Sequence, residues 1–177
     1  MIEFDFAVLS SLGLTSALAS RAASLPVPEG MPSQLLRVTE VHRESVRLHD
    51  GDAEKGARPL PRLVRSLAEE GTVLAVGDWV LGVDDAHGQT WVHERVPPLS
   101  HIARRDGDGR RHPVVSNVDV ALLVMGLDDD FSPRRLERYL ALVHGDGIVP
   151  VVVLTKADVT ARAPDEPSST SVCTYAT

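Results

Sequence analysis

The chain has 177 residues, a hydrophobic fraction of 43% and a formal charge of -7. This length suffices for one ordinary domain, or for a small domain and part of another. The negative charge excludes nucleic-acid binding through the overall field, so such binding would need a local basic patch. The single cysteine, Cys173, excludes an internal disulfide, and no spacing of Cys and His fits a zinc site. Because no run of about 18 apolar residues occurs, we expect a cytoplasmic protein that spans no membrane.

The first part of the chain predicts a leader followed by a small β-barrel. Thr15 or Ser16 can cap a short helix, which ends before Pro26. Residues 35–105 contain short runs of β-branched and apolar residues separated by Gly and Asp turns, a pattern typical of small barrels. The segment 60–67 fits either one face of a helix or the end of a strand.

The second part of the chain has the pattern of one βαβ unit. Residues 118–125 and 148–154 are nearly continuous apolar runs, which indicates strands that are buried on both faces. Between them, Ser132 predicts a helix N-cap, Pro133 fits the first helical position, and the helix runs to about His144. Such crossovers join parallel strands.

The motif Thr155-Lys156-Ala157-Asp158 directly follows the second apolar run. Ligands of open α/β sheets bind at the carboxyl ends of the strands. There, the Asp158 carboxylate can accept hydrogen bonds from N1–H and the exocyclic amino group of guanine, a donor pair that adenine lacks. The stem of Lys156 can lie across the purine, and the Thr155 hydroxyl can brace the loop. The same four residues also fit a strand-end turn with two solvated charges.

A basic loop joins the two parts of the chain. It can contact RNA phosphates, or it can be a solvated linker whose charge is diluted by Asp106 and Asp108. Its arginines are Arg104, Arg105, Arg110 and Arg111.

Trp79 and Trp91 can be stacking platforms for RNA, although tryptophans in barrels are more often core residues. The acidic run 128–130 predicts a turn that places negative charge at the start of the next helix.

Residues 113–159 strongly resemble the ribosome small subunit-dependent GTPase A family. The resemblance rests on Pro113-Val-Val-Ser-Asn-Val-Asp-Val-Ala-Leu-Leu-Val-Met-Gly-Leu127, on the segment 131–140 and on the segment 151–158. Upstream, Val76-Gly-Asp-Trp-Val80 resembles the barrel of this family, and Leu12-Gly-Leu-Thr-Ser-Ala-Leu18 resembles its leader.

The resemblance implies a mixed fold class, an N-terminal OB-fold β-barrel followed by an incomplete α/β, P-loop GTPase-like and circularly permuted βαβ unit. The zinc-binding domain of the family is not recognised in this sequence. The expected domains are a leader (1–34), an OB-fold barrel (35–105), a basic linker (106–113), a GTPase part that carries only the guanine-specificity motif (114–159) and a disordered tail (160–177).

The family function, as the resemblance implies it, is GTP binding and hydrolysis with Mg²⁺ during late maturation of the 30S subunit, with 16S rRNA as a partner. This sequence contains no Gly-x-x-x-x-Gly-Lys-Ser/Thr, and its lysines are Lys55 and Lys156. We therefore expect a truncated, monomeric form without catalytic residues or metal ligands, in which Thr155, Lys156, Ala157 and Asp158 contact guanine. Thr155 stands where the family usually has Asn. The alternatives are an OB-fold module that binds rRNA without enzymology, and a gene fragment without function.

Overall fold

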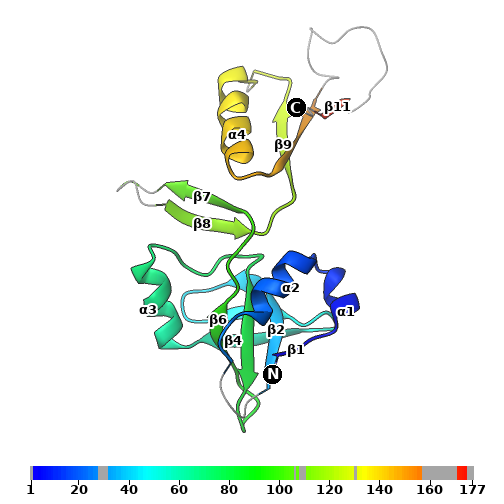
Figure 1. Cartoon of the computed structure of the whole chain (residues 1–177). Coiled ribbons are helices and arrows are strands. Elements are labelled where there is room, and N and C mark those ends of the chain that lie inside the picture. Colours follow the sequence, from blue (N-terminus) through cyan, green and yellow to red (C-terminus); the bar gives the residue numbers. More distant parts are fainter. Residues whose placement is uncertain are drawn as a thin grey trace. The chain divides into compact units, whose positions relative to one another are not determined.

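The structure is a computed structural model that describes residues 2–27, 32–105, 107, 111–129, 131–156 and 171–174. The chain divides into two compact units, Met1–Asn117 and Val118–Thr177, and each is described by itself. Figure 1 shows the elements of both units.

The helices of the described residues are α1 (Phe6–Ser10), α2 (Ser16–Ala23), α3 (Pro61–Glu69) and α4 (Pro133–Gly145). The strands of the first unit are β1 (Ile2–Glu3), β2 (Ser33–Val41), β3 (Val46–His49), β4 (Glu54–Pro59), β5 (Trp79–Asp84), β6 (Thr90–Arg95), β7 (His101–Arg105) and β8 (Arg111–Ser116). The strands of the second unit are β9 (Val120–Gly126), β10 (Val149–Thr155) and β11 (Ser171–Thr174).

Five strands of the first unit close into a barrel. Their order is β2-β3-β4-β6-β5, and β5 pairs back with β2. The strand β2 can take part in both ends of this order because it pairs with β5 over Gln34–Arg37 and with β3 over Arg37–Val41. A register shift after Val38 lets the strand bend between its two partners. With α3 inserted before β5, this is the topology of an OB-fold, and the predicted fold class is confirmed for this part.

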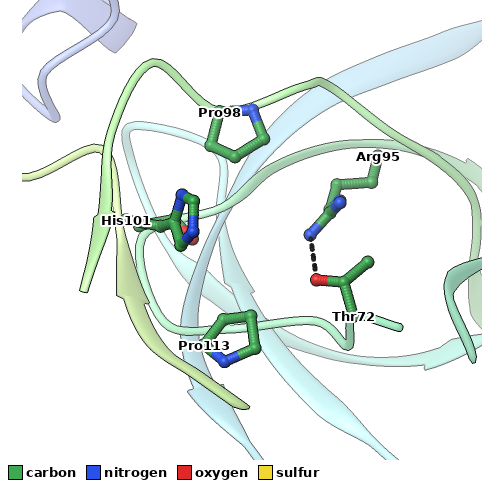
Figure 2. Close-up of a pocket in the computed structure, with 6 residues that line it drawn as sticks. Thr72, Arg95, Pro98, His101 and Pro113 are labelled. Carbon is green, nitrogen blue, oxygen red and sulfur yellow. Dashed lines mark hydrogen bonds between the residues drawn. The ribbon is translucent and has the colours of Figure 1, made fainter. Parts of the chain in front are cut away.

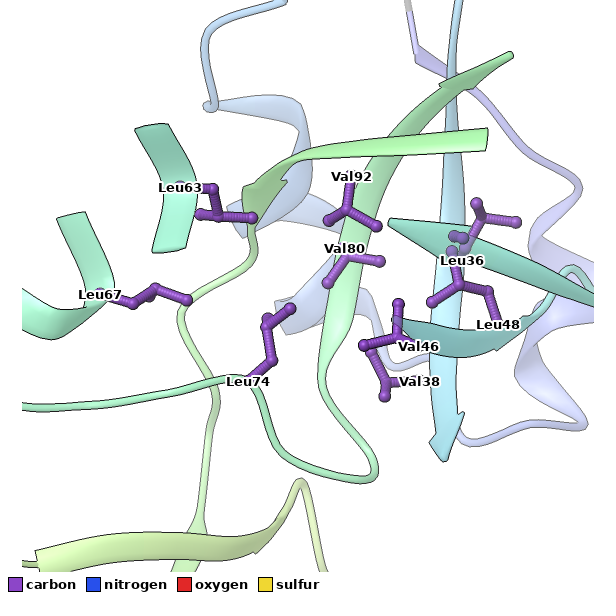
Figure 3. Packing of buried hydrophobic residues seen from close by; sticks show 10 residues of the cluster. Leu36, Val38, Val46, Leu48, Leu63, Leu67, Leu74, Val80 and Val92 are labelled. Atoms are coloured by element: carbon purple, nitrogen blue, oxygen red, sulfur yellow. The ribbon is translucent and has the colours of Figure 1, made fainter. Parts of the chain in front are cut away.

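Alternating side chains of the barrel strands build two cores. The first fills the barrel interior, and α3 contributes Leu63 and Leu67 to it (Figure 3). Its strand residues are Leu36, Val38, Val46, Leu48, Ala57, Val80 and Val92. The second core lies outside the barrel, where Leu9 and Leu18 of the leader helices pack with Leu35 and Trp79. Full burial of one such side chain stabilises the fold by roughly 1.5–3 kcal/mol.

The leader and the segment 60–67 show how local sequence determines these elements. Thr15 accepts a hydrogen bond from the Leu18 amide and is the N-cap of α2, as predicted. The ambiguous segment 60–67 lies in helix α3, which starts at Pro61. Proline is favoured in the first helical turn because the backbone N–H that it lacks would have no hydrogen-bond partner within the helix at that position. No helix in the described ranges is long and apolar enough to cross a membrane.

In the second unit, β9 and β10 pair in parallel, from Val120 opposite Val149 to Gly126 opposite Thr155. The connecting helix α4 covers one face of this pair, where the buried side chains are Met125, Val143, Ile148 and Val152. The opposite face of β9 carries Val120, Leu122 and Val124, which are 50–65% exposed. The prediction that these strands are buried on both faces was therefore wrong for β9, because α4 supplies cover on one side only.

Two further segments differ from the sequence prediction. Residues 171–174, predicted as part of a disordered tail, form β11, which pairs antiparallel with β10. The open edge of β10 offers unpaired N–H and C=O groups to such a strand. The remainder of the predicted tail, 160–170 and 175–177, lies outside the described residues. Strand β8 (Arg111–Ser116) begins within the predicted basic linker, 106–113, and pairs antiparallel with β7.

His93 is a buried ionisable group of the barrel. Its side chain lies in β6 with an exposed fraction of only 2% for the residue, and its Nε2 is 3.0 Å from the Ser33 hydroxyl. Burial lowers the pKa of the imidazole, and the positive charge of Arg62 lowers it further. The imidazole of an unfolded histidine has a pKa of about 6.5. Below that pH, the unfolded chain therefore binds a proton at His93 more readily than the folded barrel does.

We expect the free energy of unfolding of the barrel to fall as the pH is lowered from neutrality through the unfolded pKa of His93. The fluorescence of Trp79 and Trp91 reports this transition, because both tryptophans lie in the barrel. His93→Gln should weaken the pH dependence, whereas His87→Gln, in an exposed turn, should preserve it. The same pH dependence in both variants would contradict this assignment.

Candidate functional site

Two hydrogen bonds join the carboxyl ends of β9 and β10. Thr155 is the last residue of β10, and its hydroxyl donates a hydrogen bond to the Met125 carbonyl at 3.4 Å. The Leu127 amide donates to the Thr155 carbonyl at 2.9 Å. The loop that leaves β9 therefore stays against the end of β10.

Lys156 follows at the same edge of the sheet. Its backbone has a φ of 59°, in the left-handed region, and the residue lies directly after β10. Its ammonium contacts the Asp128 carboxylate at 2.5 Å, and 56% of its side chain is exposed. Ala157 and Asp158, the other residues of the predicted guanine motif, lie outside the described residues. Thr155 and Lys156 thus lie at the carboxyl edge of the strand pair, and ligands of open α/β sheets bind at that edge.

The acidic run after β9 has a role that its sequence did not suggest. The Phe131 amide donates to the Asp128 carbonyl at 2.9 Å, which forms the predicted turn. Ser132 is the N-cap of α4, as predicted, and its hydroxyl accepts from the Arg135 amide. The Asp128 carboxylate meets Lys156, which is 28 positions away in the chain. No local pattern in the sequence could have indicated that pair.

The predicted arginine cluster lies on the β7–β8 hairpin. Arg104 is exposed and is opposite His112, while Arg105 is opposite Arg111. Arg110 lies outside the described residues. The hairpin therefore brings together three of the four predicted arginines.

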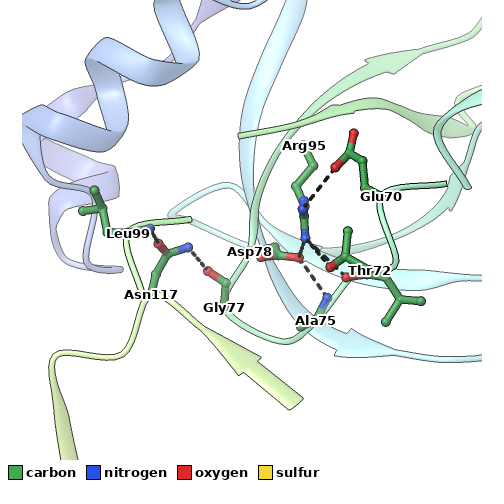
Figure 4. Close-up of polar contacts among 9 residues, drawn as sticks. Glu70, Thr72, Ala75, Gly77, Asp78, Arg95, Leu99 and Asn117 are labelled. Atoms are coloured by element: carbon green, nitrogen blue, oxygen red, sulfur yellow. Dashed lines mark hydrogen bonds and ion pairs between the residues drawn. The ribbon is translucent and has the colours of Figure 1, made fainter. Parts of the chain in front are cut away.

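The hairpin is attached to the barrel by Asn117 and Gly77 (Figure 4). The Asn117 amide group donates to the Gly77 carbonyl at 2.9 Å, and its oxygen accepts from the Leu99 amide at 2.9 Å. Gly77 has a φ of 87°, and a Cβ at this position would lie 2.2 Å from the Ser116 carbonyl oxygen. Only glycine lets the end of β8 approach the barrel this closely.

A buried ion pair lies next to this attachment. Asp78 is fully buried, accepts a hydrogen bond from the Ala75 amide at 2.9 Å, and lies 3.9 Å from the Arg95 guanidinium. Burial raises the pKa of the Asp78 carboxyl, and the Ala75 hydrogen bond and the charge of Arg95 oppose that rise. Arg95 also donates to the Thr72 hydroxyl at 3.3 Å (Figure 2). The pair joins the residue before β5 to the last residue of β6.

A small cavity of about 70 Å³ opens beside Arg95. Its lining residues are Thr72, Arg95, Pro98, His101, Pro113 and Ser116 (Figure 2). Sequence reasoning identified none of these residues as a group, since they come from three separate stretches of the chain, at 72, 95–101 and 113–116. Among the described residues, no group of three or more His, Cys, Asp or Glu side chains could hold a metal ion.

The tryptophans have different environments. Trp79 is completely buried and cannot stack on a base, which agrees with the core interpretation. Trp91 is half-buried, and its indole N–H donates to the Asp85 carboxylate at 3.0 Å. That bond is the main cause of a lowered pKa of the Asp85 carboxyl.

Comparison with known proteins agrees with this arrangement. A sequence profile described as "RsgA GTPase" matches residues 93–173, which include the hairpin, the βαβ unit and the lysine at its edge. The chain belongs to the RsgA GTPase family. This confirms the resemblance deduced from the segments 113–127, 131–140 and 151–158.

Individual RsgA proteins extend the similarity over almost the whole chain. The small ribosomal subunit biogenesis GTPase RsgA of Xanthomonas oryzae pv. oryzae is 37% identical over 172 residues, which are 93% of this chain and 45% of that protein. The protein of the same name from Xanthomonas campestris pv. campestris is 40% identical over 141 residues, which are 78% of this chain and 37% of that protein. The chain thus spans less than half the length of the curated relatives it matches.

Two solved structures share the fold. YloQ, described as a circularly permuted GTPase, matches with a TM-score of 0.55 and 21% identity, over 77% of this chain and 45% of YloQ. YjeQ from Thermotoga maritima matches with a TM-score of 0.58 and 18% identity, over 73% of this chain and 44% of YjeQ.

Gly77→Ala should destabilise the first unit of this RsgA-family chain by more than Gly71→Ala does. Both glycines have positive φ, so each substitution incurs the left-handed penalty of about 1–2 kcal/mol. Only at Gly77 would the new Cβ also collide with backbone, because nothing lies within 4 Å of a Cβ at Gly71. Denaturant unfolding followed by tryptophan fluorescence measures both losses, and equal losses would show that the close approach at Ser116 is unimportant.

Proposed function

We propose that this chain acts in the cytoplasm, as a monomer, in biogenesis of the small ribosomal subunit, where it recognises the guanine base of a nucleotide. The observation that carries the proposal is the position of Lys156 directly after β10, at the carboxyl edge of a parallel strand pair. The relatives are named small ribosomal subunit biogenesis GTPases. The name of these relatives and the position of Lys156 both support recognition of a guanine nucleotide.

The recognition chemistry follows from the residue types. Asp158 accepts from the two donors of guanine, N1–H and the exocyclic amine, and rejects adenine because its carboxylate would remain unpaired. The Lys156 stem packs on the purine face. Thr155 keeps the strand ends together through its hydrogen bond to the Met125 carbonyl.

We further propose that these 177 residues bind the nucleotide without hydrolysing it. Phosphate binding in GTPases uses a glycine-rich loop with a lysine and a hydroxyl that holds Mg²⁺. The sequence contains no such loop, and its other lysine, Lys55, lies in the barrel and pairs with Asp84. Guanosine, GDP and GTP should therefore bind with similar, weak affinities, and no phosphate should be released.

Asp158→Asn should lower the affinity for guanosine roughly tenfold or more, because a charge-assisted hydrogen bond to guanine contributes about 1.5–3 kcal/mol. The same variant should gain affinity for xanthosine, since the asparagine amide can donate to the xanthine oxygen at position 2. Equilibrium titration with guanosine, xanthosine and adenosine measures these changes.

The matched control is Asp119→Asn, an exposed carboxylate that immediately precedes β9, away from its carboxyl end. It should leave all three affinities unchanged. Guanosine binding that is equal in the two variants, or absent from the unaltered chain, refutes the proposed function.

A second candidate function is binding of ribosomal RNA through the β7–β8 hairpin. The observation that favours it is the register of the hairpin, which pairs Arg105 with Arg111 and Arg104 with His112 in a chain whose net charge is negative. Arginine forks bind phosphate well, and they need no base-specific partner. Guanine recognition in the second unit and RNA binding in the first are compatible.

The double variant Arg105→Gln/Arg111→Gln should weaken RNA binding and reduce the slope of log affinity against log salt by about 1–2, because each lost phosphate contact removes one released counterion. The control is Arg62→Gln/Arg65→Gln, which removes the same charge from two exposed positions of α3. Gel-shift titrations with a 16S rRNA fragment over a series of salt concentrations give both slopes. An equal slope of log affinity against log salt in the two double variants would exclude the hairpin as the RNA contact.

A further inference from the structure

The ion pair between Lys156 and Asp128 is the feature that the proposed guanine recognition leaves unexplained. The Lys156 ammonium lies 2.5 Å from the Asp128 carboxylate. The two side chains are unequally exposed, 56% for Lys156 and 29% for Asp128. The lysine is therefore accessible to a ligand, while its partner is largely covered.

The end of β9 is shaped to let these two side chains meet. Gly126 is the last residue of β9 and lies opposite Thr155. A Cβ at Gly126 would lie 2.8 Å from a carboxylate oxygen of Asp128 and 3.3 Å from Cδ of Lys156. The Lys156 stem thus runs over the backbone of Gly126 and reaches Asp128 beyond it. A larger residue would occupy that path.

We propose that Asp128 is a positioning residue for guanine recognition, because its carboxylate holds the Lys156 ammonium and so fixes the lysine stem along the edge where the purine binds. This inference rests on the proposed function. A free lysine side chain loses rotamer entropy when it is ordered, and this loss opposes binding. If Asp128 orders the side chain before the nucleotide arrives, the nucleotide does not have to do so, and affinity rises.

The same reasoning separates the roles of the two carboxylates. Asp158 discriminates guanine from adenine, because it alone faces the donors of the base in the proposed mode. Asp128 contacts the lysine, so its loss should weaken the binding of guanosine without changing the preference for guanosine over adenosine. An exposed ion pair contributes little to stability, so its removal should leave the fold intact.

The chain offers a direct test without nucleotide, because its lysines are Lys55 and Lys156. Acylation of the two lysine amines by an amine-reactive ester is followed by mass spectrometry of the peptides that contain them, with Lys55 as the internal reference. A bound carboxylate disfavours the neutral amine that reacts. Asp128→Asn should therefore speed the labelling of Lys156 by roughly two- to fivefold, the range that corresponds to the energy of an exposed pair.

The matched control is Asp129→Asn, which removes the same charge from the adjacent, exposed residue of the same loop. It should leave the labelling of Lys156 unchanged. Asp128→Glu retains the carboxylate and should restore most of the protection, which distinguishes a lost ion pair from a misfolded loop. Equal labelling of Lys156 in Asp128→Asn and Asp129→Asn overturns the proposal.

Guanosine titration of the same variants supplies the second readout. Asp128→Asn should lower the affinity roughly two- to fivefold, and Asp129→Asn should not change it. If labelling changes but the affinities of the two variants are equal, the pair exists and its positioning role is refuted, while the proposed function stands. If the unaltered chain binds no guanosine, the proposed function fails, and the positioning role fails with it.

Discussion

The parallel pairing of β9 with β10 is the constraint on which the candidate nucleotide site depends. Two parallel strands must be joined by a crossover, so the chain has to form α4 before it can return to the sheet. The crossover brings both carboxyl ends to one edge, and residues 28 positions apart in the chain become neighbours there. The meeting of Lys156 with Asp128 is a consequence of topology, and the glycine at position 126 makes the approach close.

The first unit is organised by β2 in a comparable way. This strand closes the barrel because it exchanges β5 for β3 as a partner near Arg37. Its Val38 also exchanges backbone hydrogen bonds with the two residues before β5: the Val38 amide donates to the Asp78 carbonyl, and the Gly77 amide donates to the Val38 carbonyl, both at 2.8 Å. The segment to which the hairpin is attached is therefore also part of the barrel closure.

Much of the fold could be predicted from sequence, because the decisive signals are local. The N-caps Thr15 and Ser132, the apolar runs of the βαβ unit and the turn-rich barrel all depend on residues near each other in the chain. The exposed face of β9 could not be predicted, since a continuous apolar run does not say what covers it. Strands β7 and β8 were missed in part because arginines replace the usual apolar alternation. The sequence places the strand-end motif at the carboxyl end of the second apolar run, and Thr155 and Lys156 lie there, whereas Asp128 and the Gly77–Asn117 attachment are through-space contacts with no sequence signal of their own.

The row formed by Val120, Leu122 and Val124 has a consequence for how the protein behaves in different solvents. Water ordered around aliphatic groups favours their contact more strongly as the temperature rises, and salts that are excluded from protein surfaces act in the same direction. Any association through this face therefore weakens on cooling and strengthens in sulfate or phosphate. Charged contacts at the arginine hairpin respond to added salt with the opposite sign, so temperature and salt together separate the two surfaces.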